Sequence, residues 1–252
     1  MTGASSTEAS NWLEEYEWKL EEAIDAYTKP VKKVQKIDGR LEGIFDKYKE
    51  KTDGNRIDVE GTIAYLEDLG INPEDLESLT LSFFLRSPSM GCFNRENFLK
   101  RWQEVGAFTV EAMAEYIKRY NEKIKNSETL YYEMYNFAFD FLMTVEGQKL
   151  LDNDLACEYW DLLLLKCERF ASSERRIKEW IEFINKVYKR AISRDTWQMF
   201  YLFVRDVVAS DPLNFKNYDE MAAWPSVIDE YVEYLRENGL LRPNTEEQYV
   251  KI

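Results

Sequence analysis

The sequence predicts an all-α protein, and three observations support this fold class. Apolar residues make up 45% of the 252 residues and recur at helical spacing along most of the chain. Only 10 Gly and 6 Pro are present to interrupt that spacing. The pair Asp53-Gly54 is flanked by charged residues and a helical pattern, so it lacks the alternating apolar strands of a β-hairpin. At this length the chain can bury the core of one main domain with a smaller appendage.

The helical patterns divide the chain into three parts. Residues 1–30 hold two short helical patterns, and a basic linker follows them. The main domain is expected over residues 36–240, where helices follow one another with short breaks. Residues 241–252 are polar and are predicted to form a tail.

The first half of the main domain contains two loops with the pattern of an EF-hand. Residues 45–69 read as helix, polar loop, a single Ile57 and a second helix. A loop over residues 86–97 places Phe93 at the position that matches Ile57, and the spacing of 36 residues suits two paired loops. With Ile57 at the eighth position, only one carboxylate falls on a ligand position of the first loop, among Glu50, Thr52, Gly54 and Gly61. We therefore expect EF-hand-like helical pairs without metal, and a calcium-responsive binding module is the alternative.

The second helical half supplies the rest of the core. Residues 130–143 carry aromatic side chains on several faces, so this helix is expected to be buried on most sides. Residues 145–154 read as a polar turn. Three long helical patterns follow, over residues 155–170, 174–189 and 193–208. Ser193 has the residue type and position of the N-cap of the last pattern.

The composition also limits the chemistry of the protein. A net charge of −14 disfavours nucleic acid and anionic membranes as partners and favours basic protein surfaces. No apolar run approaches the roughly 20 residues of a membrane span, and no basic-then-apolar leader opens the chain, so we expect no secretion. The chain has no histidine, which excludes Ser-His-Asp and Cys-His arrangements. We expect no catalytic residues, no metal and no cofactor.

The three cysteines, Cys92, Cys157 and Cys167, are too few for a four-ligand structural zinc site. Their odd number and wide spacing suit free thiols in a reducing compartment, and we expect the cytoplasm and nucleus. Cys157 lies in an apolar helical pattern and Cys167 follows one turn beyond it, and both are interpreted as buried structural residues. An enzyme with a cysteine nucleophile is a third alternative, which a lowered thiol pKa at Cys92 would support.

The segment from Asn217 to Tyr234, NYDEMAAWPSVIDEYVEY, is the most specific string in the chain. Pro225 fits the first turn of a helix, and Asp219 is placed to cap that helix. Three apolar residues then repeat at helical spacing and form one face: Ile228, Tyr231 and Leu235.

This string resembles the C-terminal signature of the family named for defective cullin neddylation. The segments GQKLLDNDLACEYWDLLL and SRDTWQMFYLFVRDV occur in the family's order and spacing, and the resemblance covers about residues 36–238. It implies a potentiating-neddylation domain that acts as a scaffold-type ligase without a covalent intermediate. Such a protein holds the C-terminal winged-helix domain of a cullin and the N-terminally acetylated conjugating enzyme of the ubiquitin-like modifier, so that catalysis arises from proximity.

The resemblance assigns the cullin-binding patch to Asp195, Ala223 and Asp229. Asp195 corresponds to the aspartate of the family's DTW motif, Ala223 precedes Trp-Pro, and Asp229 lies in SVID. The small alanine permits close approach, and the carboxylates suit a basic partner surface. A structural explanation also exists, because carboxylates favour the first turn of a helix or a solvated face.

The resemblance further implies a pocket for the acetylated methionine. An apolar pocket suits an acetylated amide and a thioether chain, whereas a charged amine would lose its hydration there. Ordinary core packing would explain the same side chains. By alignment the walls are Leu79, Leu81, Met90, Phe141, Leu155, Tyr159 and Leu162.

Residues 1–30 resemble the later part of a UBA-like domain, with its second and third helices in WLEEYEWKLEEAIDAYT. The first helix of that domain has no counterpart in the chain. Three such helices normally share one small core, so ubiquitin as a partner is only weakly implied.

Overall fold

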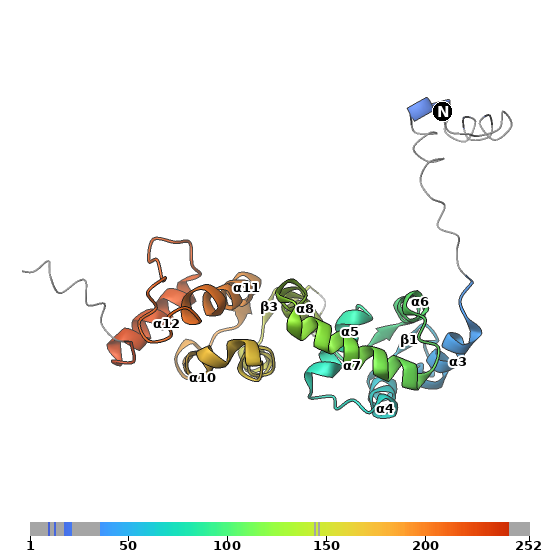
Figure 1. The fold of residues 1–252 in the computed structure, drawn as a ribbon, viewed down its shortest axis with the longest axis horizontal. Helices are drawn as coiled ribbons and strands as arrows, with labels where there is room; N and C mark the ends of the chain where they lie inside the picture. Colours follow the sequence, from blue (N-terminus) through green and yellow to red (C-terminus); the bar gives the residue numbers. More distant parts are fainter. Residues whose placement is uncertain are drawn as a thin grey trace, which may run out of the picture. The chain divides into compact units, whose positions relative to one another are not determined.

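The computed structural model describes residues 36–143, 145 and 147–241, together with Ser10, Leu13 and residues 18–21 (Figure 1). The chain separates into two units, Met1–Ile37 and Asp38–Ile252. The predicted UBA-like segment and tail lie almost entirely outside the described residues. Within the described part of the chain, no helix has both the length and the apolar character needed to cross a membrane. The described part of the second unit is mostly helical, as the sequence predicts, and all candidate site residues lie in it.

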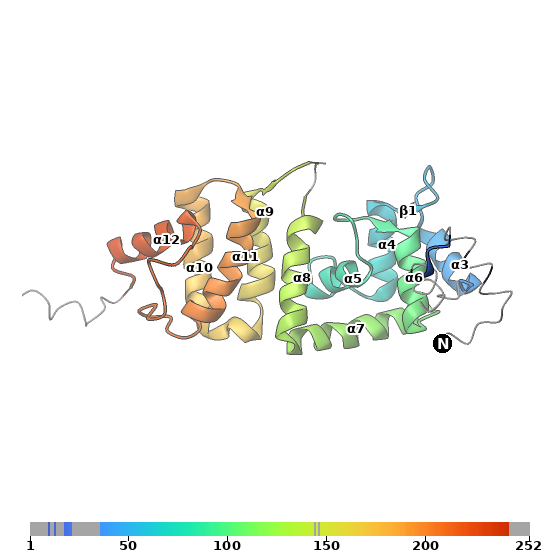
Figure 2. The ribbon, with the colours of Figure 1, turned by 90° about the horizontal axis from the view of Figure 1, so that it is seen from above.

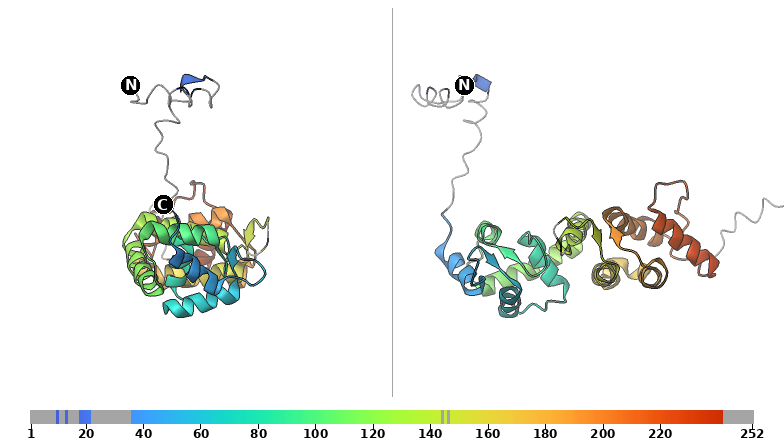
Figure 3. Two further views of the ribbon diagram at one scale, coloured as in Figure 1. Left: turned by 90° about the vertical axis from the view of Figure 1, so that its right-hand side faces the viewer. Right: turned by 180° about the vertical axis from the view of Figure 1, so that it is seen from behind.

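The first half of this unit repeats one arrangement of helix, loop, short strand and helix. The first copy runs through α3 (Gly39–Tyr48), β1 (Arg56–Ile57) and α4 (Val59–Leu69). The second runs through α5 (Leu76–Phe84), β2 (Phe93–Asn94) and α6 (Arg95–Val105). The two strands pair antiparallel with Ile57 opposite Phe93, so the pairing of the two loops predicted from the sequence is confirmed. The left view of Figure 3 shows this half from the α3 end.

Glycine occupies the last ligand position of the first loop for a steric reason. A Cβ atom at Gly61 would collide with the carbonyl oxygen of Tyr48, at the end of α3. The position therefore accommodates a close approach of two backbone segments, where a calcium loop needs a bidentate glutamate. Among the described residues, no group of three or more Cys, Asp or Glu side chains is arranged to hold a metal ion.

Helices α7 (Val110–Asn126) and α8 (Glu128–Phe141) connect the two halves. Figure 2 shows α8 between α5 and α7 on one side and α11 on the other, and residue contacts join α8 to all three. The second half contains β3 (Leu150–Leu151), α9 (Asn153–Trp160), α10 (Glu174–Phe183), β4 (Ile192–Ser193), α11 (Arg194–Phe203) and α12 (Ser226–Glu237). Short π-helical segments extend α9, α10 and α11, over Asp161–Leu165, Ile184–Tyr188 and Val204–Val208.

Stacked aromatic rings form the core of the second half. The rings of Trp160 and Trp197 lie 5.4 Å apart at 17°, and those of Trp180 and Phe200 lie 4.1 Å apart at 13°. Tyr135 on α8 accepts a hydrogen bond from Trp160 Nε1 and donates one to the Trp197 carbonyl, each of 2.8 Å. These contacts join α8, α9, α10 and α11 and satisfy the polar atoms of Tyr135 and Trp160.

The structure confirms the predicted N-cap of α11 but corrects the predicted polar turn before α9. The Ser193 hydroxyl accepts a hydrogen bond from Thr196 N, so the predicted N-cap of α11 is confirmed. The predicted polar turn over residues 145–154 is wrong in part, because Leu150–Leu151 form β3 and pair with β4. A two-residue strand is too short to give a periodic signal, and its partner is about 40 residues away along the chain.

Cys157 is buried, as the sequence predicts, but Cys167 is not fully buried. Cys157 is 5% exposed, and burial raises the pKa of its thiol to about 12. Cys167 is half-buried and lies beyond the end of the helix, since the helical backbone stops at Leu165 and a 3-10 helix begins at Glu168. The helical pattern predicted over residues 155–170 therefore ends early, at Leu165.

Candidate binding sites

The turn before α12 is built around Asp219. Its carboxylate accepts a hydrogen bond of 2.9 Å from Met221 N. Its carbonyl oxygen accepts bonds from Ala222 N and from Trp224 Nε1, of 3.1 and 3.2 Å. Helix α12 begins only at Ser226, and Pro225 precedes it with an extended backbone. The expectations that Asp219 caps α12 and that Pro225 lies inside its first turn are therefore wrong, since Asp219 instead fixes the turn that leads to the helix.

Aromatic contacts and one hydrogen bond hold this turn against the helices. The Trp224 ring meets the Phe203 ring on α11 edge-on, at 5.6 Å, and lies 6.4 Å from the Tyr218 ring. The Tyr218 hydroxyl donates a hydrogen bond of 2.5 Å to Asp229 Oδ1 on α12. Burial, and then this carboxylate, raise the pKa of Tyr218, so the phenol stays protonated and keeps orienting Asp229.

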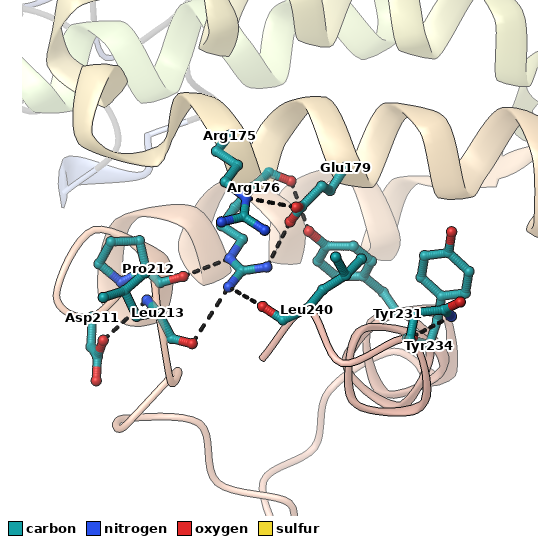
Figure 4. A network of polar contacts seen from close by, with 10 residues as sticks. Arg175, Arg176, Glu179, Asp211, Pro212, Leu213, Tyr231, Tyr234 and Leu240 are labelled. Atoms are coloured by element: carbon teal, nitrogen blue, oxygen red, sulfur yellow. Dashed lines mark hydrogen bonds and ion pairs between the residues drawn. The ribbon is translucent and has the colours of Figure 1, made fainter. Parts of the chain in front are cut away.

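A buried arginine anchors both ends of the C-terminal segment on α10 (Figure 4). Arg176 is only 2% exposed. It donates to the carbonyl oxygens of Pro212 and Leu240, at 2.5 and 2.9 Å, and pairs with Glu179 at 2.6 Å. The Tyr231 hydroxyl on α12 donates to the Arg176 carbonyl at 2.7 Å. Several charge-assisted hydrogen bonds thus offset the cost of burying the Arg176 cation. Through these bonds Arg176 holds the start of the connection that follows α11 and the end of the segment that follows α12.

The three residues of the predicted cullin-binding patch have different environments. Asp195 is exposed in the first turn of α11, and Ala223 is exposed in the turn before α12. Asp229 is half-buried and held by Tyr218. Ala223 and Asp229 thus belong to one segment, residues 218–229, which these contacts hold in place and which is called the braced turn below. The segment before α12 packs on α11 at Phe203, through Trp224. Asp195 lies eight positions before Phe203 in α11, which corresponds to about 12 Å along the helix axis. The assignment of the patch stays a prediction.

The predicted pocket residues divide into three groups by burial. Leu79, Leu81 and Phe141 are 3%, 0% and 5% exposed and belong to packed interior. Met90 is 45% exposed, and its backbone N–H donates to the Phe141 carbonyl at 3.1 Å, which brings these two together. The remaining residues are half-buried: Leu155, Tyr159 and Leu162. Leu79 and Phe141 share one cluster, and Leu155 and Tyr159 pack against it.

A cleft of about 950 Å³ lies at the junction of α5, α7 and the π-helical segment after α9. Of the predicted pocket residues, Leu162 lines it, together with Leu76 and the half-buried Cys167. Most of its lining is charged or polar, including Glu77 and Lys166. The sequence gives no signal for this cleft, because three segments that lie far apart along the chain form it and no local pattern shows that they meet. The acetyl-methionine pocket itself stays a prediction.

The environment of Cys92 contradicts the interpretation of a cysteine nucleophile. Its carbonyl accepts a hydrogen bond of 2.5 Å from the Ser87 hydroxyl, in the turn before β2. Burial raises the pKa of the Cys92 thiol, which lowers the thiolate fraction at neutral pH. An activated cysteine requires the opposite shift.

Comparison with known proteins agrees with this architecture. A family model described as Cullin binding matches residues 112–234, which contain the aromatic core, Arg176 and the braced turn. The class is therefore that of helical proteins with a cullin-binding domain.

Relatives that match nearly the full length of this chain identify the family within this class. Defective in cullin neddylation protein 1 of Candida albicans is 42% identical, over 96% of this chain and 96% of that protein. The proteins of the same name from Yarrowia lipolytica and Candida glabrata are 36% and 31% identical, over 94% and 92% of this chain and 93% and 89% of their own lengths. The chain belongs to the defective-in-cullin-neddylation family.

Proposed function

We propose that this protein promotes cullin neddylation as a non-covalent, scaffold-type ligase. Family membership at 42% identity along nearly the whole chain is the observation that carries the proposal. The braced turn supports it physically, because rigid surface carboxylates can meet a basic partner without first being ordered. The chain contributes no catalytic residue to this reaction.

The cullin would dock through its C-terminal winged-helix domain on the surface of Asp195, Ala223 and Asp229. Both aspartates reach solvent, and Ala223 has too small a side chain to keep a partner at a distance. Carboxylates of this kind form charge-assisted hydrogen bonds with lysine or arginine. A net charge of −14 also steers a basic partner towards the protein.

The conjugating enzyme would be held by its acetylated N-terminal methionine. Half-buried Leu155, Tyr159 and Leu162 offer apolar surface next to the buried Leu79 and Phe141. Acetylation removes the positive charge of the amine, so the methionine can enter apolar surroundings without loss of ionic hydration. Holding both partners on one scaffold converts an encounter of separate molecules into a local reaction, an effect worth up to about 7–11 kcal/mol.

A reconstituted reaction tests the proposal. Modification of the cullin lysine would be followed with and without this protein, and we expect a faster reaction in its presence. Asp229→Lys should abolish most of the acceleration, since like charges would meet across the interface at a cost of several kcal/mol, or about 100-fold or more in affinity. Asp195→Ala should cost about 1.5–3 kcal/mol through lost charge-assisted hydrogen bonds.

Glu115→Lys is the matched control, because Glu115 is an exposed carboxylate on α7. It should leave the rate and the cullin affinity, measured by calorimetric titration, unchanged. Equal cullin affinity of wild type and Asp229→Lys would contradict the assigned patch. No acceleration by the folded wild type would contradict the proposed function.

A further inference from the structure

Met221 is the most exposed large apolar side chain among the described residues, with 92% of its surface accessible. The other exposed methionine in the described part of the chain, Met90, is 45% exposed. Met221 lies in the turn between α11 and α12, two residues before Ala223. Its side chain makes almost no contact with the rest of the fold, so the folded state gains little from an apolar residue there.

The backbone on both sides of Met221 is fixed. Its own N–H donates to the Asp219 carboxylate at 2.9 Å, and the next N–H, of Ala222, donates to the Asp219 carbonyl at 3.1 Å. Trp224 N then donates to the Ala222 carbonyl at 2.9 Å, and the Trp224 ring packs on Phe203. An isolated surface methionine is ordinary, but this one is presented on a rigid turn and loses little backbone entropy when a partner binds.

The surroundings of Met221 place one large apolar side chain among small and charged residues. Ala222 and Ala223 are exposed and small, so they leave the methionine standing above its neighbours. Glu220 pairs with Arg236, and Asp229 is tied to the same segment through Tyr218. An apolar contact flanked by charged residues is the usual arrangement of a protein interface, in which a polar rim surrounds a desolvated centre.

We propose that Met221 is a specificity-determining contact of the cullin interface, inserted into an apolar pocket that basic residues of the cullin surround. The inference rests on the proposed function and extends its surface beyond the three assigned residues. Methionine suits this role because its unbranched, polarisable side chain adapts to irregular pockets. Burial of the side chain should contribute about 10- to 100-fold to the affinity.

Substitution tests the contact. Met221→Ser should weaken binding of the cullin winged-helix domain about 10- to 100-fold in calorimetric titration, while Met221→Leu should restore binding to within about 3-fold. The heat-capacity change of binding should become less negative in Met221→Ser, because less apolar surface is buried. The melting temperature should not change, since Met221 lies outside the packed core. Ile63→Ser, at a side chain 52% exposed on α4 and outside residues 112–234, should leave the affinity unaltered.

Methyl spectroscopy gives an independent measurement. In protein labelled with ¹³C at the methionine methyl groups, titration with the cullin domain should shift or broaden the Met221 signal. The signals of Met90 and of the buried Met113 and Met134 should stay in place. Equal affinity of Met221→Ser, with an unmoved Met221 methyl and normal binding by wild type, would overturn this inference alone. Absence of binding by the wild type would overturn the proposed function as well.

Discussion

The two candidate sites differ in which side chains hold them in place. Around Asp229, the exposed residues that would meet a partner are held by other residues, chiefly Arg176, Tyr218 and Trp224. In the predicted apolar pocket, the proposed wall residues Leu79 and Phe141 are themselves part of the core. Binding and folding are thus separable at the first site and coupled at the second. A substitution there must be judged by stability before its effect on binding has meaning.

The largest expected effect is on the anchor of the first site. Arg176→Met removes one partner of a buried ion pair and leaves the carbonyls of Pro212 and Leu240 without their donor. We expect the free energy of unfolding in urea to fall by about 3–5 kcal/mol. Arg175→Met is the matched control, because the 62% exposed Arg175 also pairs with Glu179 and should cost less than about 1 kcal/mol. Similar losses in the two variants would contradict the anchoring role.

The coupling of folding and binding at the second site can be tested within one set of residues. Leu81→Ala should lower the free energy of unfolding by about 2–5 kcal/mol, because Leu81 is fully buried. Tyr159→Ala and Leu162→Ala should lower the free energy of unfolding by less, because both side chains are half-buried. These two substitutions should weaken binding of an acetylated peptide from the conjugating enzyme. Their cullin affinity should remain at the wild-type level, as judged by calorimetry. A parallel loss of cullin affinity would show that the two sites are not independent.

A smaller effect concerns the ligand of the second site. An acetylated N-terminal peptide of the conjugating enzyme should bind at least about 10-fold more tightly than its unacetylated counterpart, since only the latter brings a charge into apolar surroundings. Fluorescence polarisation with folded wild type measures both affinities. If the two peptides bind equally, the protein lacks this pocket, and the scaffold proposal keeps only its cullin-binding part.

No effect is expected from calcium. Glycine at position 61 and the single carboxylate at the ligand positions leave the first loop without a bidentate ligand. Millimolar calcium should therefore leave the melting temperature unchanged, because only a ligand that binds the folded state raises it. An increase that a chelator reverses would revive the alternative of a calcium-responsive module.

Much of the helical framework could be predicted because its signals are local. The apolar face of Ile228, Tyr231 and Leu235 is fully buried, as the helical spacing predicts. The pairing of Ile57 with Phe93 also followed from sequence, since the two residues hold matching positions in loops 36 residues apart. Pocket walls could not be separated from core residues in this way, because both are apolar and recur at the same spacing.

The string RDTW and the segment from Asn217 to Tyr234 determined the family, and periodicity determined the helices, because both are properties of neighbouring residues. The tertiary structure alone decided which of the adjacent arginines 175 and 176 is buried. The choice depends on the carbonyls of Pro212 and Leu240, which lie 36 and 64 residues further along the chain. The same holds for the pairing of Leu151 with Ile192 and for the exposure of Met221 on its turn. A side chain's burial depends on what packs over it, and the covering segments come from parts of the chain that carry no local signal of their meeting.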